Sequence, residues 1–247
     1  MPAATPHYLV GSHMEVIWNA VVEAAQLLGS GAPFLFEIIF LSLRVSAIAV
    51  GIAMVVGIPI GYLLGVGRFF GRRLSLVIVN TGMGLPPVVA GLIVFMFLSR
   101  SGPLGDLRLL FSTPAMIIAQ VFISTPLVAG VTTAAVASVP LELRLQARSL
   151  GASWGQEAVL TIKEARRGVM AAVVAGFGGI ISEVGAVMIV GGNIEHSTRV
   201  MTTAIVLEAR KGNFGTALAL GFILIGISFV INGLLTTLQQ SGARYER

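Results

Sequence analysis

The chain contains no cysteine, which excludes disulfide bonds, thiolate metal sites and a cysteine nucleophile. Charged residues are also scarce, at 11% of the sequence. There is no HExxH, GxSxG or Walker A sequence, and two of the three histidines lie within the first 13 residues. We therefore predict no catalytic centre, no metal site and no phosphate-binding loop in this chain.

Hydrophobic residues, by contrast, make up 55% of the sequence, and glycine occurs 30 times. A mean hydropathy of +0.92 is typical of an integral membrane protein. A helix needs roughly 20 residues to cross the hydrocarbon of a bilayer. Five segments approach or exceed that length, at residues 34–64, 74–98, 114–137, 169–190 and 214–238. The sequence thus predicts an all-α polytopic membrane protein with about five transmembrane helices.

The residues before the first span fall into two parts. Gly-Ser-His-Met at 11–14 is typical of a cloning remnant, and we interpret residues 1–13 as derived from a tag or vector. The stretch 16–28 is partly amphipathic and ends at a Gly-Ser-Gly breaker. We expect residues 14–33 to be external or interfacial and residues 34–247 to form the transmembrane domain.

The basic residues predict the orientation of the spans. They are scattered between apolar runs, which argues against a nucleic-acid surface. If segment 141–168 lies inside, the inner segments hold Arg68, Arg72, Arg73, Arg144, Arg148, Lys163, Arg166, Arg167, Arg244 and Arg247. The outer segments hold only Arg100, Arg108, Arg199, Arg210 and Lys211. The positive-inside rule then places the N-terminus outside and the C-terminus in the cytoplasm.

Segment 141–168 is a charged island with the pattern of two short amphipathic helices. Leu143, Ala147, Leu150 and Trp154 recur at helical spacing and predict one apolar face, with Arg144, Gln146 and Arg148 facing elsewhere. Gly151 predicts a turn or a close backbone approach between the halves. In the second half, Ala158, Ile162 and Ala165 lie opposite Lys163, Arg166 and Arg167. An exposed apolar face of this kind requires a partner surface.

This segment resembles the EAA loop of ABC-importer permeases, a cytoplasmic helix-turn-helix that in that family sits in a groove of the ATPase subunit. Leu145, Gln146 and Ala147 stand where the family has Glu-Ala-Ala, and Lys163 and Glu164 replace a late Leu-Pro. Residues 150–153, Leu-Gly-Ala-Ser, match the family. Segments 42–65, 84–92, 181–193 and 197–214 extend the resemblance, which is strongest to the tungstate permeases within the molybdate, sulfate and tungstate branch.

The resemblance implies a permease subunit of a binding-protein-dependent importer, which is not itself an enzyme. Its expected partners are an ABC ATPase subunit that carries ATP and Mg, an external solute-binding protein, a second copy of this chain and the oxyanion. It implies a multi-pass protein of the prokaryotic plasma or inner membrane, with no cofactor and no nucleic acid. The residues expected to couple to the ATPase are Leu143, Gln146, Ala147, Leu150, Gly151, Ala152, Trp154 and Glu164.

Polar and helix-breaking residues within the spans are candidates for the pathway or gate. They are Arg44, Pro86, Pro87 and Glu183, because buried charges need partners and prolines free backbone carbonyls. The alternatives are ordinary helix packing for the prolines, structural hydrogen bonding for Glu183 and snorkelling to the outer face for Arg44. Ala172, Gly176 and Gly179 form a small-residue face suited to tight helix packing.

An oxyanion is expected to meet hydroxyls, backbone N–H groups and helix N-termini along its route. Such groups gather before a predicted short helix at 200–209, at Asn193, Ser197, Thr198, Arg199, Thr202 and Thr203. The resemblance places them at the outer mouth, where the binding protein docks; a solvated external loop is the alternative. For the whole chain, we predict an oxyanion permease, with tungstate favoured over molybdate or sulfate. A membrane channel or a membrane-embedded enzyme is the alternative of another class.

Overall fold

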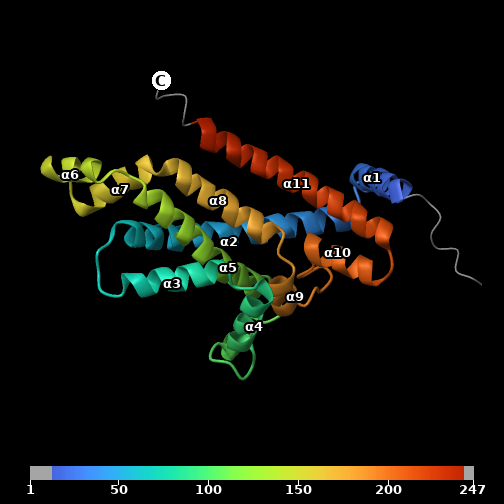
Figure 1. The fold of residues 1–247 in the computed structure, drawn as a ribbon. Helices are drawn as coiled ribbons and strands as arrows, with labels where there is room; N and C mark the ends of the chain where they lie inside the picture. Colours follow the sequence, from blue (N-terminus) through green and yellow to red (C-terminus); the bar gives the residue numbers. More distant parts are fainter. Residues whose placement is uncertain (1–12, 242–247) are drawn as a thin grey trace, which may run out of the picture.

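The computed structural model describes residues 13–241, which form α-helices joined by short loops and contain no strand (Figure 1). Residues 1–12 of the predicted tag, and Arg244 and Arg247, lie outside this range. The elements are α1 (His13–Gly29), α2 (Pro33–Val66), α3 (Arg72–Met83), α4 (Pro87–Leu98), the 3-10 turn η1 (Gly105–Leu107), α5 (Thr113–Ala137), α6 (Leu141–Ser149), α7 (Trp154–Glu164), α8 (Arg166–Ile181), α9 (Gly185–Gly191), α10 (Met201–Arg210) and α11 (Phe214–Ser241). The prediction of an all-α fold is confirmed.

The long apolar helices account for the predicted spans. Three of them, α2, α5 and α11, are each long and apolar enough to cross a membrane. Two further pairs also qualify, α3 with α4 and α8 with α9, but they are bent by 106° and 59°. The structure therefore has three unbroken spans, and up to five if each bent pair counts as one. The second and fourth predicted spans are not single straight helices.

Local chemistry explains where one of these helices breaks. Pro86 is extended, with φ −58° and ψ 128°, because a residue that precedes proline is disfavoured in the helical region. Pro87 then begins α4, where its missing N–H costs nothing. Pro59, by comparison, lies inside α2 without interrupting it. The proline pair therefore breaks the second span, whereas the single Pro59 leaves α2 continuous.

Helices α2 and α5 pack together through glycines of α2 that are spaced four residues apart. A Cβ atom at Gly61 would lie 2.6 Å from Thr132 Cβ and 2.7 Å from the Ala129 carbonyl oxygen. Added Cβ atoms at Gly57 and Gly65 would also lie within 3.0 Å of α5 side chains. Only hydrogen at these positions lets the two backbones approach this closely. The glycines therefore determine the separation of α2 and α5.

Helix α8 covers another side of α5. Ala172 is buried, and a Cβ atom at Gly176 would lie 3.1 Å from Val128 Cγ2, which confirms the predicted small-residue contact at these two positions. A Cβ atom at Gly179 would be at an ordinary 3.8 Å from Leu127. At the other end of the molecule, α1 lies against α11, where Thr216 donates a hydrogen bond of 2.6 Å to Glu23 (Figure 1). This contact anchors the N-terminal segment to the last span.

Candidate functional site

Helices α6 and α7 form a hairpin at the end of the molecule opposite α1 and α10 (Figure 1). Gly151 has φ +87°, a conformation that favours glycine, and its N–H donates to the Arg148 carbonyl oxygen. A Cβ atom there would meet nothing within 4 Å, so the glycine serves the turn and not a close contact. Ser153 then begins α7 through a capping box with Gln156. The predicted turn is confirmed.

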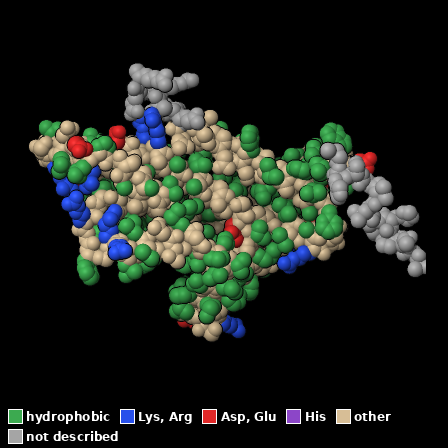
Figure 2. Space-filling view, viewed as in Figure 1, with side chains coloured by type: hydrophobic (Ala, Val, Ile, Leu, Met, Phe, Trp, Pro, Cys, Tyr) green, Lys and Arg blue, Asp and Glu red, His purple; other side chains and the backbone are tan. Residues whose placement is uncertain are grey.

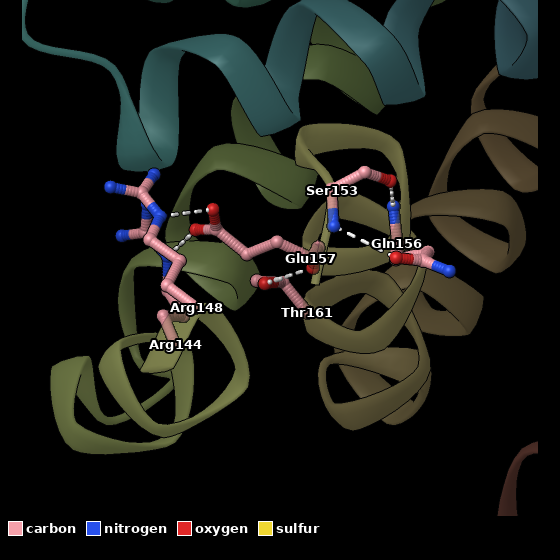
Figure 3. A network of polar contacts seen from close by, with 6 residues as sticks. All are labelled: Arg144, Arg148, Ser153, Gln156, Glu157 and Thr161. Atoms are coloured by element: carbon pink, nitrogen blue, oxygen red, sulfur yellow. Dashed lines mark hydrogen bonds and ion pairs between the residues drawn. The ribbon is translucent and has the colours of Figure 1, made fainter. Parts of the chain in front are cut away.

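A buried carboxylate holds the two helices of the hairpin together (Figure 3). Glu157 of α7 is 1% exposed, and its two oxygens accept hydrogen bonds from Arg144 Nε at 2.8 Å and Arg148 Nε at 2.6 Å. Both arginines lie on α6, one turn apart. We did not predict Glu157 as a site residue. The signal in the sequence was partial: two arginines spaced by four share a helical face and favour an acidic partner, but their spacing does not show which carboxylate supplies it.

These arginines control the charge on Glu157. Burial by itself would raise the pKa of this carboxyl, but the hydrogen bonds and positive charges of Arg148 and Arg144 outweigh burial and lower the pKa. The ion pair therefore stabilises the fold at pH values above the ordinary glutamate pKa of about 4.3. That contribution is lost as the pH falls through the lower pKa of the folded state.

We expect Glu157→Gln to destabilise the hairpin by about 1–3 kcal/mol near neutral pH, because it leaves Arg144 and Arg148 without a counter-charge. The wild-type advantage should shrink as the pH falls below about 4. The chain has two tryptophans, so a Trp18→Phe background leaves Trp154 as a fluorescent reporter of hairpin unfolding. Glu142→Gln, at an exposed glutamate of the same hairpin, is the matched control. Equal stability of both variants at pH 7 would contradict this role for Glu157.

The outer face of the hairpin carries a shallow depression of about 580 Å³. It is lined by Leu143, Gln146, Ala147, Leu150, Gly151, Ala152, Gln156 and Leu160. The Leu150 side chain is 88% exposed, so packing within this chain does not explain an apolar residue at that position. The structure thus brings together six of the predicted coupling residues and adds Gln156 and Leu160 from α7. This face has the apolar, partly concave character of a protein docking surface.

Two details of the predicted apolar face are wrong. Trp154 does not join it: its ring meets Tyr62 of α2 edge to face at 6.0 Å, on the other side of α6. Gln146, predicted to face away, lines the depression. The reason is the turn at Gly151, which ends the helical register before Trp154 begins a new helix. Glu164 is exposed at the end of α7, outside the depression.

In the second half of segment 141–168, the apolar residues lie on one side of the helix and the basic residues on the other, as predicted. Ala165 is buried, and Ala158 and Ile162 pack with it against Tyr62 and Val136. Lys163 is exposed. This packing joins the inner face of α7 to the ends of α2 and α5. The hairpin that carries the depression, which we call the docking depression below, therefore rests directly on the membrane spans.

The pathway candidates occupy two broken helices that touch each other. At the break of the fourth span, the Glu183 carboxylate accepts a 2.9 Å hydrogen bond from the Ala186 N–H in the first turn of α9. At the break of the second span, Val88 follows the proline pair and lies against Gly185 of α9. A Cβ atom added at Gly185 would lie 2.6 Å from Val88 Cγ2. Arg44 is exposed on α2 and has no ion pair within residues 13–241. The structure therefore groups Glu183 with Pro86 and Pro87, and leaves Arg44 apart.

The outer-mouth candidates lie around the α9–α10 connection. Three of them, Thr198, Thr202 and Thr203, are buried, and their hydroxyls bond to backbone groups. The Thr198 hydroxyl donates to Gly191 O and accepts from Ile194 N. The Thr202 hydroxyl donates to Glu183 O, and the Thr203 hydroxyl accepts from Val200 N. Ser197 is exposed, and Asn193 and Arg199 are partly buried. The three threonines shape this loop and offer no unbonded hydroxyl to a ligand. The predicted helix is confirmed as α10, and the role of this region as the mouth stays a prediction.

The described part of the chain, residues 13–241, contains no group of three His, Asp or Glu residues that could hold a metal. Its notable features are the α6–α7 hairpin at one end, two broken helices that touch each other, and the α9–α10 loop, in which three threonine hydroxyls bond to backbone groups. This arrangement defines a polytopic helical membrane protein. Residues 57–241 match the family of binding-protein-dependent transport system inner membrane components, and the chain belongs to this family.

Two permeases and one solved structure are similar to this chain along most of its length. The chain is 45% identical over 206 residues to a probable anion ABC transporter permease protein of Haloferax volcanii, covering 81% of this chain and 89% of that protein. It is 42% identical over 227 residues to a tungstate uptake system permease protein of Peptoclostridium acidaminophilum, covering 92% of this chain and all of that protein. A bacterial ABC transporter involved in import of the acidic polysaccharide alginate has the same fold, with a TM-score of 0.75 at 18% identity and coverage of 94% and 91%.

Proposed function

We propose that this chain forms the translocation pathway of an ABC importer for an oxyanion, with tungstate as the substrate. The observation that carries the proposal is the docking depression on the hairpin, seated on the ends of the spans, in a chain similar along nearly its whole length to a tungstate uptake permease. The importer contains two copies of the chain, two ATPase subunits with ATP and Mg, and an external binding protein. It resides in the prokaryotic plasma or inner membrane.

The geometry suggests how force reaches the pathway. An ATPase that binds Leu150 and its neighbours moves the hairpin as one unit, because Glu157 ties α6 to α7. The hairpin in turn packs on α2 and α5 through Ala165 and Tyr62. Displacement of these span ends is transmitted to α8 and, through the break at Glu183, to α9 and the proline-broken second span. Broken helices are suited to this motion because their ends can shift without unwinding a turn.

The substrate proposal is tested by uptake into proteoliposomes that contain this chain, its cognate ATPase and the binding protein. We expect ATP-dependent uptake of tungstate in preference to molybdate and sulfate. The binding protein should set that preference, because the chain has few cations at membrane depth and must release what it admits. Arg199→Gln should therefore change the uptake rate and not the order of the anions. Preferential sulfate uptake, or a changed order in Arg199→Gln, would contradict the assignment.

The orientation can be tested independently of transport, because the chain has no native cysteine. Ser149 and Ser197 are both exposed, at the hairpin end and at the α9–α10 loop. We expect a cysteine at position 149 to react with an impermeant maleimide only from the cytoplasmic side, and one at 197 only from outside. Labelling of both from one side would remove a span from the topology, and the reverse pattern would invert it.

A further inference from the structure

A cavity of about 860 Å³ lies on the side of α6 that faces away from the docking depression. Its walls come from the end of α2, the α2–α3 loop, the end of α5 and the hairpin. Four arginines line it, Arg68, Arg72, Arg144 and Arg148, and no acidic side chain of the described residues does. Figure 2 shows basic side chains gathered at this end of the molecule. We call this space the arginine cavity.

The arginines around the cavity use only part of their hydrogen-bonding capacity. Arg72 Nε donates to the Leu64 carbonyl oxygen at 2.9 Å, and Arg144 and Arg148 each donate Nε to Glu157. Within residues 13–241, their terminal amino groups and the whole Arg68 guanidinium have no hydrogen-bond partner. Arg144 is only 15% exposed, so most of its side chain is shielded from water. A half-buried guanidinium with unused donors favours an anionic ligand.

The charges also remain unbalanced. Glu157 is the acidic partner of Arg144 and Arg148, and a single carboxylate cannot neutralise four guanidinium groups. Carboxylates, phosphates and related oxyanions bind guanidinium groups through pairs of parallel hydrogen bonds. The rest of the wall has an apolar part, which includes Leu63 and Trp154.

We propose that the arginine cavity binds a tetrahedral oxyanion, supplied either as the phosphate of an anionic lipid headgroup or as a free oxyanion. The cavity lies where α2 and α5 end, the level at which basic pockets between spans meet lipid headgroups and released solutes. Arg68 and Arg72 follow α2, whereas Arg144 and Arg148 belong to the hairpin. A bound oxyanion therefore bridges the spans to the hairpin and fixes the position of the docking depression.

Trp154 lines the cavity and provides a direct readout. The full chain with Trp18→Phe is placed in phosphatidylcholine nanodiscs and titrated with tungstate or phosphate, with chloride at matched ionic strength as the anion control. A second set of nanodiscs contains phosphatidylglycerol. We expect a saturable change in Trp154 emission with the oxyanions, with phosphatidylglycerol or with both, and none with chloride. Response to free oxyanion identifies a solute site, and response to phosphatidylglycerol alone identifies a headgroup site.

Arginine variants locate the binding. Arg68→Gln is the principal variant because Arg68 makes no internal bond that folding would miss, and Arg148→Gln is the second. Each should weaken oxyanion binding about tenfold, or lower the response to phosphatidylglycerol to a similar extent. Arg73→Gln removes the same charge from an exposed neighbour outside the cavity and should change binding by less than about twofold. Absence of any oxyanion or phosphatidylglycerol response, or equal weakening by Arg73→Gln, would overturn the proposal.

Discussion

Gly61→Leu is expected to prevent the chain from folding into a monodisperse membrane protein. The first side-chain atom would already lie 2.6 Å from Thr132 and 2.7 Å from a backbone oxygen of α5, and backbone cannot move aside as a side-chain tip can. Overpacking of a core costs about 1–3 kcal/mol, and more where backbone must move, against a total stability of about 5–15 kcal/mol. Gly61→Ala should show the milder effect, a lower unfolding temperature of the folded protein.

The same helix offers a matched control for this prediction. Gly51 also lies in α2, and a Cβ atom there would meet nothing within 4 Å. Gly51→Ala and Gly51→Leu should leave size-exclusion profiles and thermal unfolding in detergent nearly unchanged, because they add side chain to open space. If Gly61→Leu were as stable as Gly51→Leu, the glycine contacts would not determine how α2 and α5 pack.

Leu150→Asp is expected to abolish assembly with the ATPase while leaving the membrane fold intact. Leu150 is 88% exposed in the chain alone, so its replacement removes no internal packing. In the complex, the change would remove about 1.5–3 kcal/mol of apolar burial and place an unpaired charge in the interface. A loss of affinity of 100-fold or more, about 3 kcal/mol, should follow. Co-purification of the two subunits and binding-protein-stimulated ATP hydrolysis would measure it.

A control for this prediction lies one residue away. Ser149 is exposed on α6 but does not line the docking depression, so Ser149→Asp adds the same charge beside the surface without entering it. We expect near-normal assembly for Ser149→Asp and an unchanged thermal unfolding profile for both variants. Normal complex yield and normal stimulated ATP hydrolysis with Leu150→Asp would show that the ATPase does not bind this face of the hairpin.

The hairpin shows why spacing alone predicts part of a site. Leu143 and Ala147 lie on α6 and Leu150 is the residue that caps its C-terminal end, so the 3.6-residue period is sufficient to place all three on one face. Trp154 follows Gly151, whose left-handed backbone restarts the register, so its spacing of four from Leu150 has no helical meaning. Glu157 was missed for a related reason. Its partners lie on the other helix, and only the fold of the hairpin brings them together.

The outer loop illustrates a different limit. Clustered Ser, Thr, Asn and Arg residues indicate polar chemistry, but hydroxyls can satisfy backbone groups as well as ligands. The hydroxyls of Thr198, Thr202 and Thr203 bond to backbone groups. Which hydroxyls do so depends on which carbonyl and N–H groups the folded loop leaves without a backbone partner. Residue type therefore predicted a polar region correctly without showing which of its members remain available.

The sequence by itself determined that this protein is helical, crosses a membrane and carries a charged hairpin with a glycine turn. These properties depend on composition and local period, which act over a few residues. Tertiary structure alone decided the approach of α2 and α5 at Gly61, the burial of Glu157 between two arginines, the contact between the two broken spans, and the gathering of Arg68 and Arg72 with Arg144 and Arg148 around one cavity. Each of these joins residues distant along the chain or placed on separate helices, and its energy depends on distances that exist only after the helices have packed.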